Sequence, residues 1–116
     1  MAICYDLRFP ELFRRYAVQG AKVIVIPAEW PIERIDHWRT LLQARAIENQ
    51  CYMIATNCAG PSGDKTFGGH SMIVDPWGHV TAKVSDGTGW ATARIDPKVT
   101  ARVRRDMPVL EHRKRV

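Results

Sequence analysis

The chain has 116 residues, which is enough for one domain with a modest hydrophobic core that needs neither a disulfide nor a metal to fold. Its composition is that of a globular protein, no apolar run approaches membrane-spanning length, and the N-terminal residues lack the charged-then-apolar layout of a signal peptide, so we expect a cytoplasmic protein. The net charge of +5 arises after residue 93, because residues 94–116 carry eight basic and three acidic side chains and residues 1–93 carry nine of each.

The first quarter of the chain predicts a strand, a turn, a helix and a second strand. A short apolar stretch ends at Cys4, a helix is expected over 10–19, and Gly20 ends it. Residues 22–27 form a continuous β-branched run, which is typical of a strand covered on both faces. This order is a βαβ unit, and it predicts an α/β fold with a mixed or parallel sheet.

The remaining elements follow from equally local signals. The expected segments are a proline-stiffened loop over 27–31, a long helix over 33–50, buried strands over 52–56 and 71–75, a glycine-rich loop over 57–69, strands over 80–84 and 90–95, and a helix that begins at Pro97 with Asp96 as its cap. The apolar arc of the long helix is broad enough for a second contact besides the sheet, and a partner subunit is one candidate. Arg45 and Glu48 are expected to pair locally on this helix.

The cysteines and histidines do not form a metal-binding pattern. Cys4, Cys51 and Cys58 are odd in number and lack CxxC spacing, so we expect reduced thiols, with the last two inert in the core. The four histidines lack the spacing typical of metal ligands. They are His37, His70, His79 and His112. We therefore expect no metal site and no cofactor.

Cys4 is the candidate nucleophile. A thiol at a corner between an apolar stretch and a helix is exposed, and neighbouring backbone N–H groups can point at the group it attacks. The alternative is a cysteine on a frayed chain end. Asp6, Arg8 and Glu11 lie so close together that an ion-pair network supporting this turn is expected, and Arg8 as a clamp for a substrate carboxylate is the alternative.

Three separated blocks carry a resemblance to a known family. The segment 3–12, ICYDLRFPEL, resembles the nucleophile motif of the nitrilase superfamily, the carbon-nitrogen hydrolases. Residues 37–50, HWRTLLQARAIENQ, are similar to its long helix, and residues 69–78, GHSMIVDPWG, to its following strand and turn. Together with PAEWP at 27–31, these blocks resemble the ω-amidase-like branch, which includes 2-oxoglutaramate amidases.

The resemblance implies a fold and a mechanism. The fold would be the C-terminal half of an αββα sandwich, a mixed sheet with covering helices, with residues 1–116 as a partial domain. The family uses a glutamate, a lysine and a cysteine, and only the cysteine has a counterpart here, Cys4. The backbone N–H of Tyr5 would help to form the oxyanion hole. The loop containing Glu29 and Trp30 would lie near the active site, with substrate binding and simple packing both open for these two residues.

The same resemblance implies a substrate class and an assembly. The expected substrate is a small amide, such as an ω-amide of a dicarboxylic acid, cleaved through a cysteine thioester, and the expected assembly is a homo-oligomer. Because the family's glutamate and lysine belong to the first half, we expect this chain to be inactive alone. The alternative to an enzyme is a non-enzymatic binding or interaction module that uses the basic tail, about 106–116. That tail lacks interleaved aromatic residues, so nucleic-acid binding is disfavoured.

Overall fold

A four-stranded sheet with helices on one face forms the body of the protein. The computed structural model describes residues 1–85 and 87–114. The sheet has the order β1-β2-β5-β6, and its strands are β1 (Val23–Ala28), β2 (Tyr52–Asn57), β5 (Met72–Val74) and β6 (Val80–Lys83). The β1/β2 pair is parallel and the other two pairs are antiparallel, so the predicted mixed sheet is confirmed.

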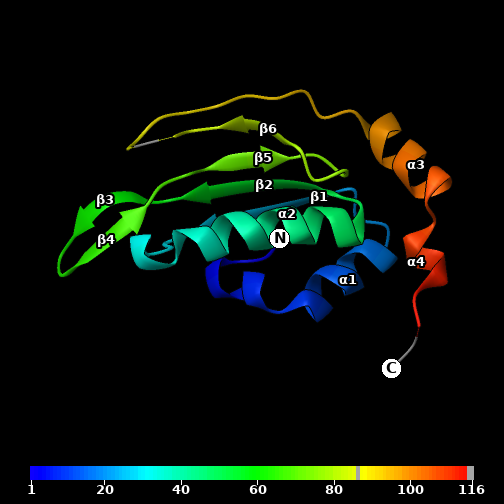
Figure 1. Ribbon diagram of the computed structural model, residues 1–116, viewed down its shortest axis with the longest axis horizontal. Coiled ribbons are helices and arrows are strands. Elements are labelled where there is room, and N and C mark those ends of the chain that lie inside the picture. Colours follow the sequence, from blue (N-terminus) through cyan, green and yellow to red (C-terminus); the bar gives the residue numbers. More distant parts are fainter. Residues whose placement is uncertain (86, 115–116) are drawn as a thin grey trace.

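Two helices cover the same face of this sheet, as Figure 1 shows. They are α1 (Pro10–Val18) and α2 (Ile35–Asn49), preceded by the short 3₁₀ turns η1 (Cys4–Arg8) and η2 (Ile32–Arg34). On α2 the side chains of Trp38 and Leu42 are completely buried, and they face Ile26 and Met53 in one hydrophobic core. Trp38, Leu42 and Ala46 follow one another at helical spacing and form the buried stripe, whereas Ile47, which belongs to the broader apolar arc expected from the sequence, is 48% exposed.

In residues 1–85 and 87–114, no helix covers the opposite face of the sheet. Along β1 the burial alternates, with Ile24 and Ile26 inside and Val23 and Val25 exposed by 38% and 41%. The expectation that this strand is covered on both faces is therefore wrong for the chain as described. β-Branched residues favour a strand conformation whichever face they lie on, so they occur on both faces of β1 although helices pack against only one face.

The parallel pair is connected differently from the prediction. No strand precedes Cys4 in the described residues, where Ala2 donates one backbone hydrogen bond to the Val25 carbonyl at 3.1 Å. The βαβ unit is instead β1–α2–β2, with α2 as the crossover helix. The strand ends near Ala28 and Asn57 consequently lie at the same edge of the sheet.

Two further segments differ from the expected loop and strand. The glycine-rich stretch contains a hairpin, β3 (Ala59–Ser62) and β4 (Lys65–Gly68), which extends beyond one end of the sheet (Figure 1). Residues 90–95 run beside β6 without forming a strand, and Trp90 is 85% exposed. Ala91, Ala93 and Ile95 are half-buried and alternate with the exposed Thr92 and Arg94, so partial burial follows the apolar alternation although no strand forms.

The C-terminal part packs against the opposite end of the sheet (Figure 1). Helix α3 (Pro97–Asp106) begins as predicted, because the Asp96 carboxylate accepts a hydrogen bond from the Lys98 backbone N–H at 2.9 Å. A short helix, α4 (Val109–His112), follows within the segment predicted to be a polar tail, and Leu110 packs against the core. The last two residues of that segment, 115 and 116, lie outside the described residues.

Arg104 shows why the basic charge of this part does not form one open surface. Its Nη2 donates to the Ala21 carbonyl at 2.6 Å and approaches the Asn49 carbonyl at 3.4 Å. The buried Gln50 amide similarly donates to the Met107 carbonyl at 2.7 Å. These side chains connect α3 to the body of the protein, so at least one of the predicted tail cations has a structural role.

The packing of α2 on the sheet predicts a clear difference between two truncations. Leu42→Ala removes a completely buried side chain and should lower the free energy of unfolding by about 2–5 kcal/mol. Val18→Ala, at a position that is 46% exposed, should cost under about 1 kcal/mol. Urea unfolding measures both, and equal losses for the two variants would contradict this packing.

Candidate functional site

Cys4 opens a short turn whose backbone is held in an unusual conformation. Cys4 has a φ of +43°, in the left-handed region that side-chain-bearing residues seldom adopt. The Asp6 carboxylate accepts a hydrogen bond from the Ile3 N–H at 2.9 Å, and the Asp6 N–H donates back to the Ile3 carbonyl at 2.9 Å. These two bonds close the chain around Cys4 and fix its half-buried side chain at the start of the turn.

A buried arginine holds the same turn from the other side. Arg45, which is 5% exposed, donates from Nε and Nη2 to the Leu7 carbonyl at 3.1 and 2.9 Å. Its Nη1 pairs with Glu48 at 3.0 Å, which confirms the expected local pair. The guanidinium also lies 5.6 Å from the centre of the Phe13 ring, so one side chain of α2 contacts both η1 and α1.

The turn borders a cavity of about 490 Å³. Its lining residues come from η1, the end of β1 and η2, and they are Cys4, Tyr5, Arg8, Glu29, Trp30, Pro31 and Arg34. The cavity thus brings together five of the residues selected from the sequence. Asp6 and Glu11 are not among its lining residues, and Asp6 acts on the backbone of the turn instead.

Arg8 is held by aromatic rings. Within residues 1–85 and 87–114, no ion pair joins Arg8 to Asp6 or Glu11, so the expected ion-pair network is wrong. The Arg8 guanidinium carbon lies 4.8 Å from the Trp30 ring centre and 5.8 Å from that of Tyr5. A guanidinium stacked in this way retains donors that can still bind a ligand, because its planar face rather than its edge is occupied.

Trp30 forms a rigid wall of the cavity. It is only 2% exposed, its backbone N–H donates to Asn57 Oδ1 at 2.6 Å, and its Nε1 donates to the Arg34 carbonyl at 2.7 Å. Asn57 Nδ2 donates in turn to the Trp30 carbonyl at 3.2 Å and to the Gly69 carbonyl at 2.9 Å. Asn57 therefore joins the carboxyl ends of β1 and β2 to the loop before β5.

Arg45 and Asn57 are the two structurally important polar residues that sequence reasoning missed. For Arg45 a signal was present, since it follows Trp38 and Leu42 at helical spacing on the buried stripe of α2. A cation at such a position needs a buried acceptor, although the sequence does not say which one. Asn57 ends a buried strand and carries no comparable signal.

The three thiols have different environments. Cys51 is completely buried, as expected, and burial raises the pKa of its thiol although the nearby Arg104 guanidinium opposes the shift. Cys58 is exposed, so the expectation that it is a core thiol is wrong. It follows the last residue of β2, where the chain leaves the sheet toward the β3–β4 hairpin.

The described residues also define what the site does not contain. Among residues 1–85 and 87–114, no three histidine, cysteine or acidic side chains are grouped so that they could hold a metal ion. No helix in this part of the chain is both long and apolar enough to cross a membrane. The side chains that line the cavity offer a thiol, a phenol, a carboxylate, an indole and two guanidinium groups.

The site thus combines a half-buried thiol at a strained turn with the carboxyl ends of two parallel strands. The sequence profile of the carbon-nitrogen hydrolase family matches residues 1–105, and the chain belongs to that family. It is 51% identical over 109 residues to a 2-oxoglutaramate amidase of Bacillus subtilis (strain 168), with 94% of this chain and 42% of that protein covered.

Solved structures show the same fold. The Caenorhabditis elegans NitFhit protein superposes with a TM-score of 0.95 at 41% identity, over 98% of this chain and 28% of that one. Nit3 of Saccharomyces cerevisiae, a member of the nitrilase superfamily, superposes with a TM-score of 0.86 at 34% identity, over 92% of this chain and 40% of the Nit3 chain. The predicted family and fold class are confirmed, and the chain spans less than half the length of each of these relatives.

Removing the Arg45 guanidinium should loosen the turn that carries Cys4. Arg45→Met leaves the Leu7 carbonyl without its buried donors, which should cost about 1–3 kcal/mol of unfolding free energy. Alkylation of Cys4 by iodoacetamide, followed by peptide mass spectrometry, should become faster than in the parent chain. Arg39→Met, at a half-exposed site on the same helix, is the control. Equal stability and equal alkylation rates for the two variants would show that Arg45 does not hold the turn.

The raised pKa of Cys51 predicts a pH-dependent contribution to stability. A cysteine in the unfolded chain has a pKa of about 8.5, whereas the buried Cys51 thiol keeps its proton to higher pH. As the pH rises, the unfolded state therefore loses its proton first, which lowers the free energy of unfolding. The difference in unfolding free energy between the parent chain and Cys51→Ala should therefore narrow between about pH 8 and pH 10. A Cys51→Ala difference that is independent of pH would contradict the assignment.

Proposed function

We propose that Cys4 is the nucleophile of an amide-hydrolysing enzyme, and that this chain supplies the thiol side of its active site. The observation that carries the proposal is the Cys4 turn itself, with its positive φ, at the edge of a cavity that also contains Tyr5 and Arg8. Holding a nucleophile in a strained backbone position is a recurrent feature of functional sites. Membership of the carbon-nitrogen hydrolase family supports the reaction class.

The first step forms a bond from Cys4 Sγ to the amide carbonyl carbon of the substrate. The carbonyl oxygen becomes an oxyanion, and the thiol proton is transferred to a base. Tyr5 is the second residue of η1, so its backbone N–H has no acceptor within that turn and can donate to the oxyanion. A donor in this position typically contributes about 10²- to 10³-fold in rate.

Collapse of the tetrahedral intermediate breaks the C–N bond. Ammonia leaves with a proton returned by the base, and the acyl group remains on Cys4 as a thioester. Water then attacks the thioester, releases the carboxylic acid and regenerates the thiol. The resemblance to the family implies that the base is a glutamate and that a lysine completes the oxyanion hole. We propose that both lie in the part of the enzyme that corresponds to the remaining length of its relatives.

The charges around Cys4 support a substrate that carries a carboxylate. Arg8 and Arg34 both line the cavity, and Glu29 is the one acid among the seven described lining residues. The stacked Arg8 guanidinium is pre-oriented by Trp30, so it can bind a carboxylate with little loss of side-chain entropy. An ω-amide similar to 2-oxoglutaramate has a carboxylate at the end opposite the amide, and it fits this arrangement. The similarity to a 2-oxoglutaramate amidase of Bacillus subtilis supports the same substrate class.

The wider setting is also a proposal. We propose a homo-oligomeric cytoplasmic enzyme with no cofactor. The exposed side chains of α1 and α2, among them Val18 and Ile47, support a further contact on the helical face. Leu110, within the basic tail, packs against the core, and Arg104, just before the tail in α3, donates to a backbone carbonyl. Neither observation favours the non-enzymatic binding module.

A chimera tests the proposed activity directly. In it, this chain replaces the matched 42% of the Bacillus 2-oxoglutaramate amidase, and ammonia release from 2-oxoglutaramate is measured. The chimera should be active, the 116-residue chain alone should not, and Cys4→Ala in the chimera should lower kcat by at least about 10³-fold because covalent catalysis is lost.

Cys58→Ala in the same chimera is the matched control, since it removes an exposed thiol outside the cavity. It should leave kcat within about twofold of the parent chimera, as expected for a surface substitution. A folded Cys4→Ala chimera with undiminished ammonia release would refute the role of Cys4. Turnover by the 116-residue chain alone would refute the need for a further glutamate and lysine.

A further inference from the structure

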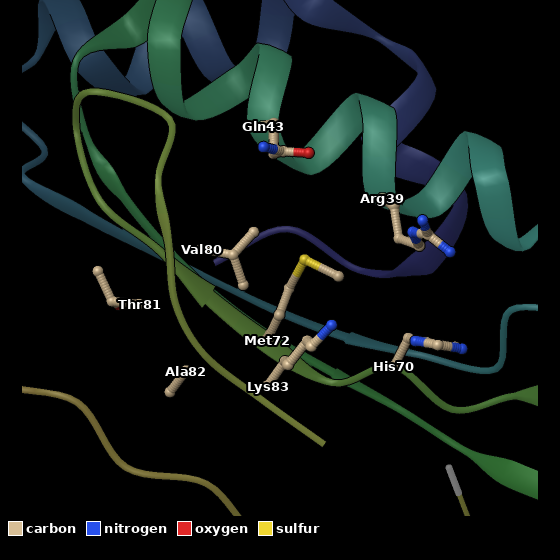
Figure 2. Close-up of a pocket in the computed structure, with 8 residues that line it drawn as sticks. All are labelled: Arg39, Gln43, His70, Met72, Val80, Thr81, Ala82 and Lys83. Carbon is tan, nitrogen blue, oxygen red and sulfur yellow. The ribbon is translucent and has the colours of Figure 1, made fainter. Parts of the chain in front are cut away.

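A second cavity, of about 530 Å³, lies between α2 and the β5–β6 edge of the sheet (Figure 2). Its lining residues come from α2, from the loop before β5 and from β5 and β6, and they are Arg39, Gln43, His70, Met72, Val80, Thr81, Ala82 and Lys83. None of them lines the cavity at Cys4. The proposed amidase reaction makes no use of this second cavity.

The charged groups of this cavity are all of one sign. Arg39, Lys83 and, when protonated, His70 come from three separate elements, and no described lining residue is acidic. Figure 2 shows the ends of these three side chains extending into the same space. Asp36 approaches Arg39 at 3.7 Å but is 87% exposed, so it neutralises the guanidinium only weakly. The cavity therefore favours an anion.

The backbone around the cavity is held in place. His70 has a φ of +55°, and its carbonyl accepts a hydrogen bond at 2.9 Å from Nε1 of the completely buried Trp38. Lys83 is the cross-strand partner of Met72, so both side chains project toward α2. Gln43 is fixed by its hydrogen bond to the Gly78 carbonyl at 3.0 Å. The backbone positions that carry His70 and Lys83 are thus set before any ligand binds.

The remaining lining is apolar. Met72 is 4% exposed, and Val80 and Ala82 add further aliphatic surface beside it. A volume of this size lies within the range of small-molecule sites, which combine apolar walls with a few charged groups. A ligand that fits has at least two anionic groups for the cations and a short body between them that is small enough for the cavity.

We propose that this cavity is a second ligand site, separate from the Cys4 cavity, that binds a small polyanion bearing carboxylate or phosphate groups. Arg39 and Lys83 bind the anionic groups, and His70 adds a donor. The proposal does not depend on the function of Cys4. The His70 carbonyl is hydrogen-bonded to Trp38, and the Trp38 ring centre lies 5.5 Å from that of Trp30, which lines the Cys4 cavity. A ligand bound at His70 would therefore be linked to the Cys4 cavity through these two tryptophans.

Titrations with citrate and with pyrophosphate at constant ionic strength test this proposal, and they distinguish a carboxylate ligand from a phosphate ligand. Binding is followed through the backbone amide resonances of Gln43, Thr81 and Ala82 in the 116-residue chain. At least one of the two anions should shift these resonances saturably. Arg39→Gln and Lys83→Gln should each weaken that binding about tenfold, as expected for the loss of one charge-assisted contact.

Two charge-matched controls make the test specific. Lys65→Gln removes a cation from the exposed β4 strand, and Arg34→Gln removes one from the Cys4 cavity. Both should leave the titration of Thr81 and Ala82 unchanged. The absence of saturable shifts with either anion would overturn the proposal. Equal weakening by all four substitutions would do the same, because it would show a response to net charge alone.

Discussion

The hydrogen bonds from the Arg45 guanidinium to the Leu7 carbonyl are the contact on which the geometry around Cys4 depends. Leu7 and Arg45 are 38 residues apart and lie in different elements, so this contact locks the N-terminal turn onto the long helix. Besides this contact, the turn is held by the complete burial of Leu7 in the core and by the Ala2 N–H bond to Val25. A buried cation with satisfied donors fixes a single arrangement here, because any alternative leaves a charge without a partner.

A second set of contacts fixes the opposite wall of the cavity. Asn57 connects the ends of the two parallel strands through the backbone of Trp30, and the Trp30 ring then positions Arg8. The nucleophile and the guanidinium therefore belong to one short turn, while their supports come from the long helix and the sheet. This division keeps the reactive groups at the surface of a rigid framework, which is how enzymes limit the entropy lost on binding substrate.

Local signals in the sequence were sufficient to predict many of the elements. Pro10 and Gly20 bracket α1, the stripe of Trp38 and Leu42 identifies α2, and Asp96 marks the start of α3. The Pro76–His79 turn predicts the β5–β6 hairpin for the same reason. Each of these features depends on residues within a few positions of one another, so spacing alone is informative.

Features that depend on distant partners could not be predicted in this way. The β3–β4 hairpin lies in a stretch rich in glycine and proline, which the sequence predicts to be a loop. Residues 90–95 alternate in polarity, yet the structure shows no strand there. Arg8 has acidic neighbours in sequence, yet Trp30, 22 positions away, comes to lie beneath it after folding. For the candidate site, the residues of the cavity were largely predictable, whereas their supports, Arg45 and Asn57, were not.

The central claim is that Cys4 becomes acylated during turnover, and acid-quench mass spectrometry of the chimera with 2-oxoglutaramate tests it most directly. The account predicts an acyl adduct, with a mass equal to the substrate less ammonia, on the proteolytic peptide that contains Cys4. An adduct confined to Cys58 would contradict the account, as would ammonia release with no adduct under conditions where hydrolysis of the thioester limits the rate.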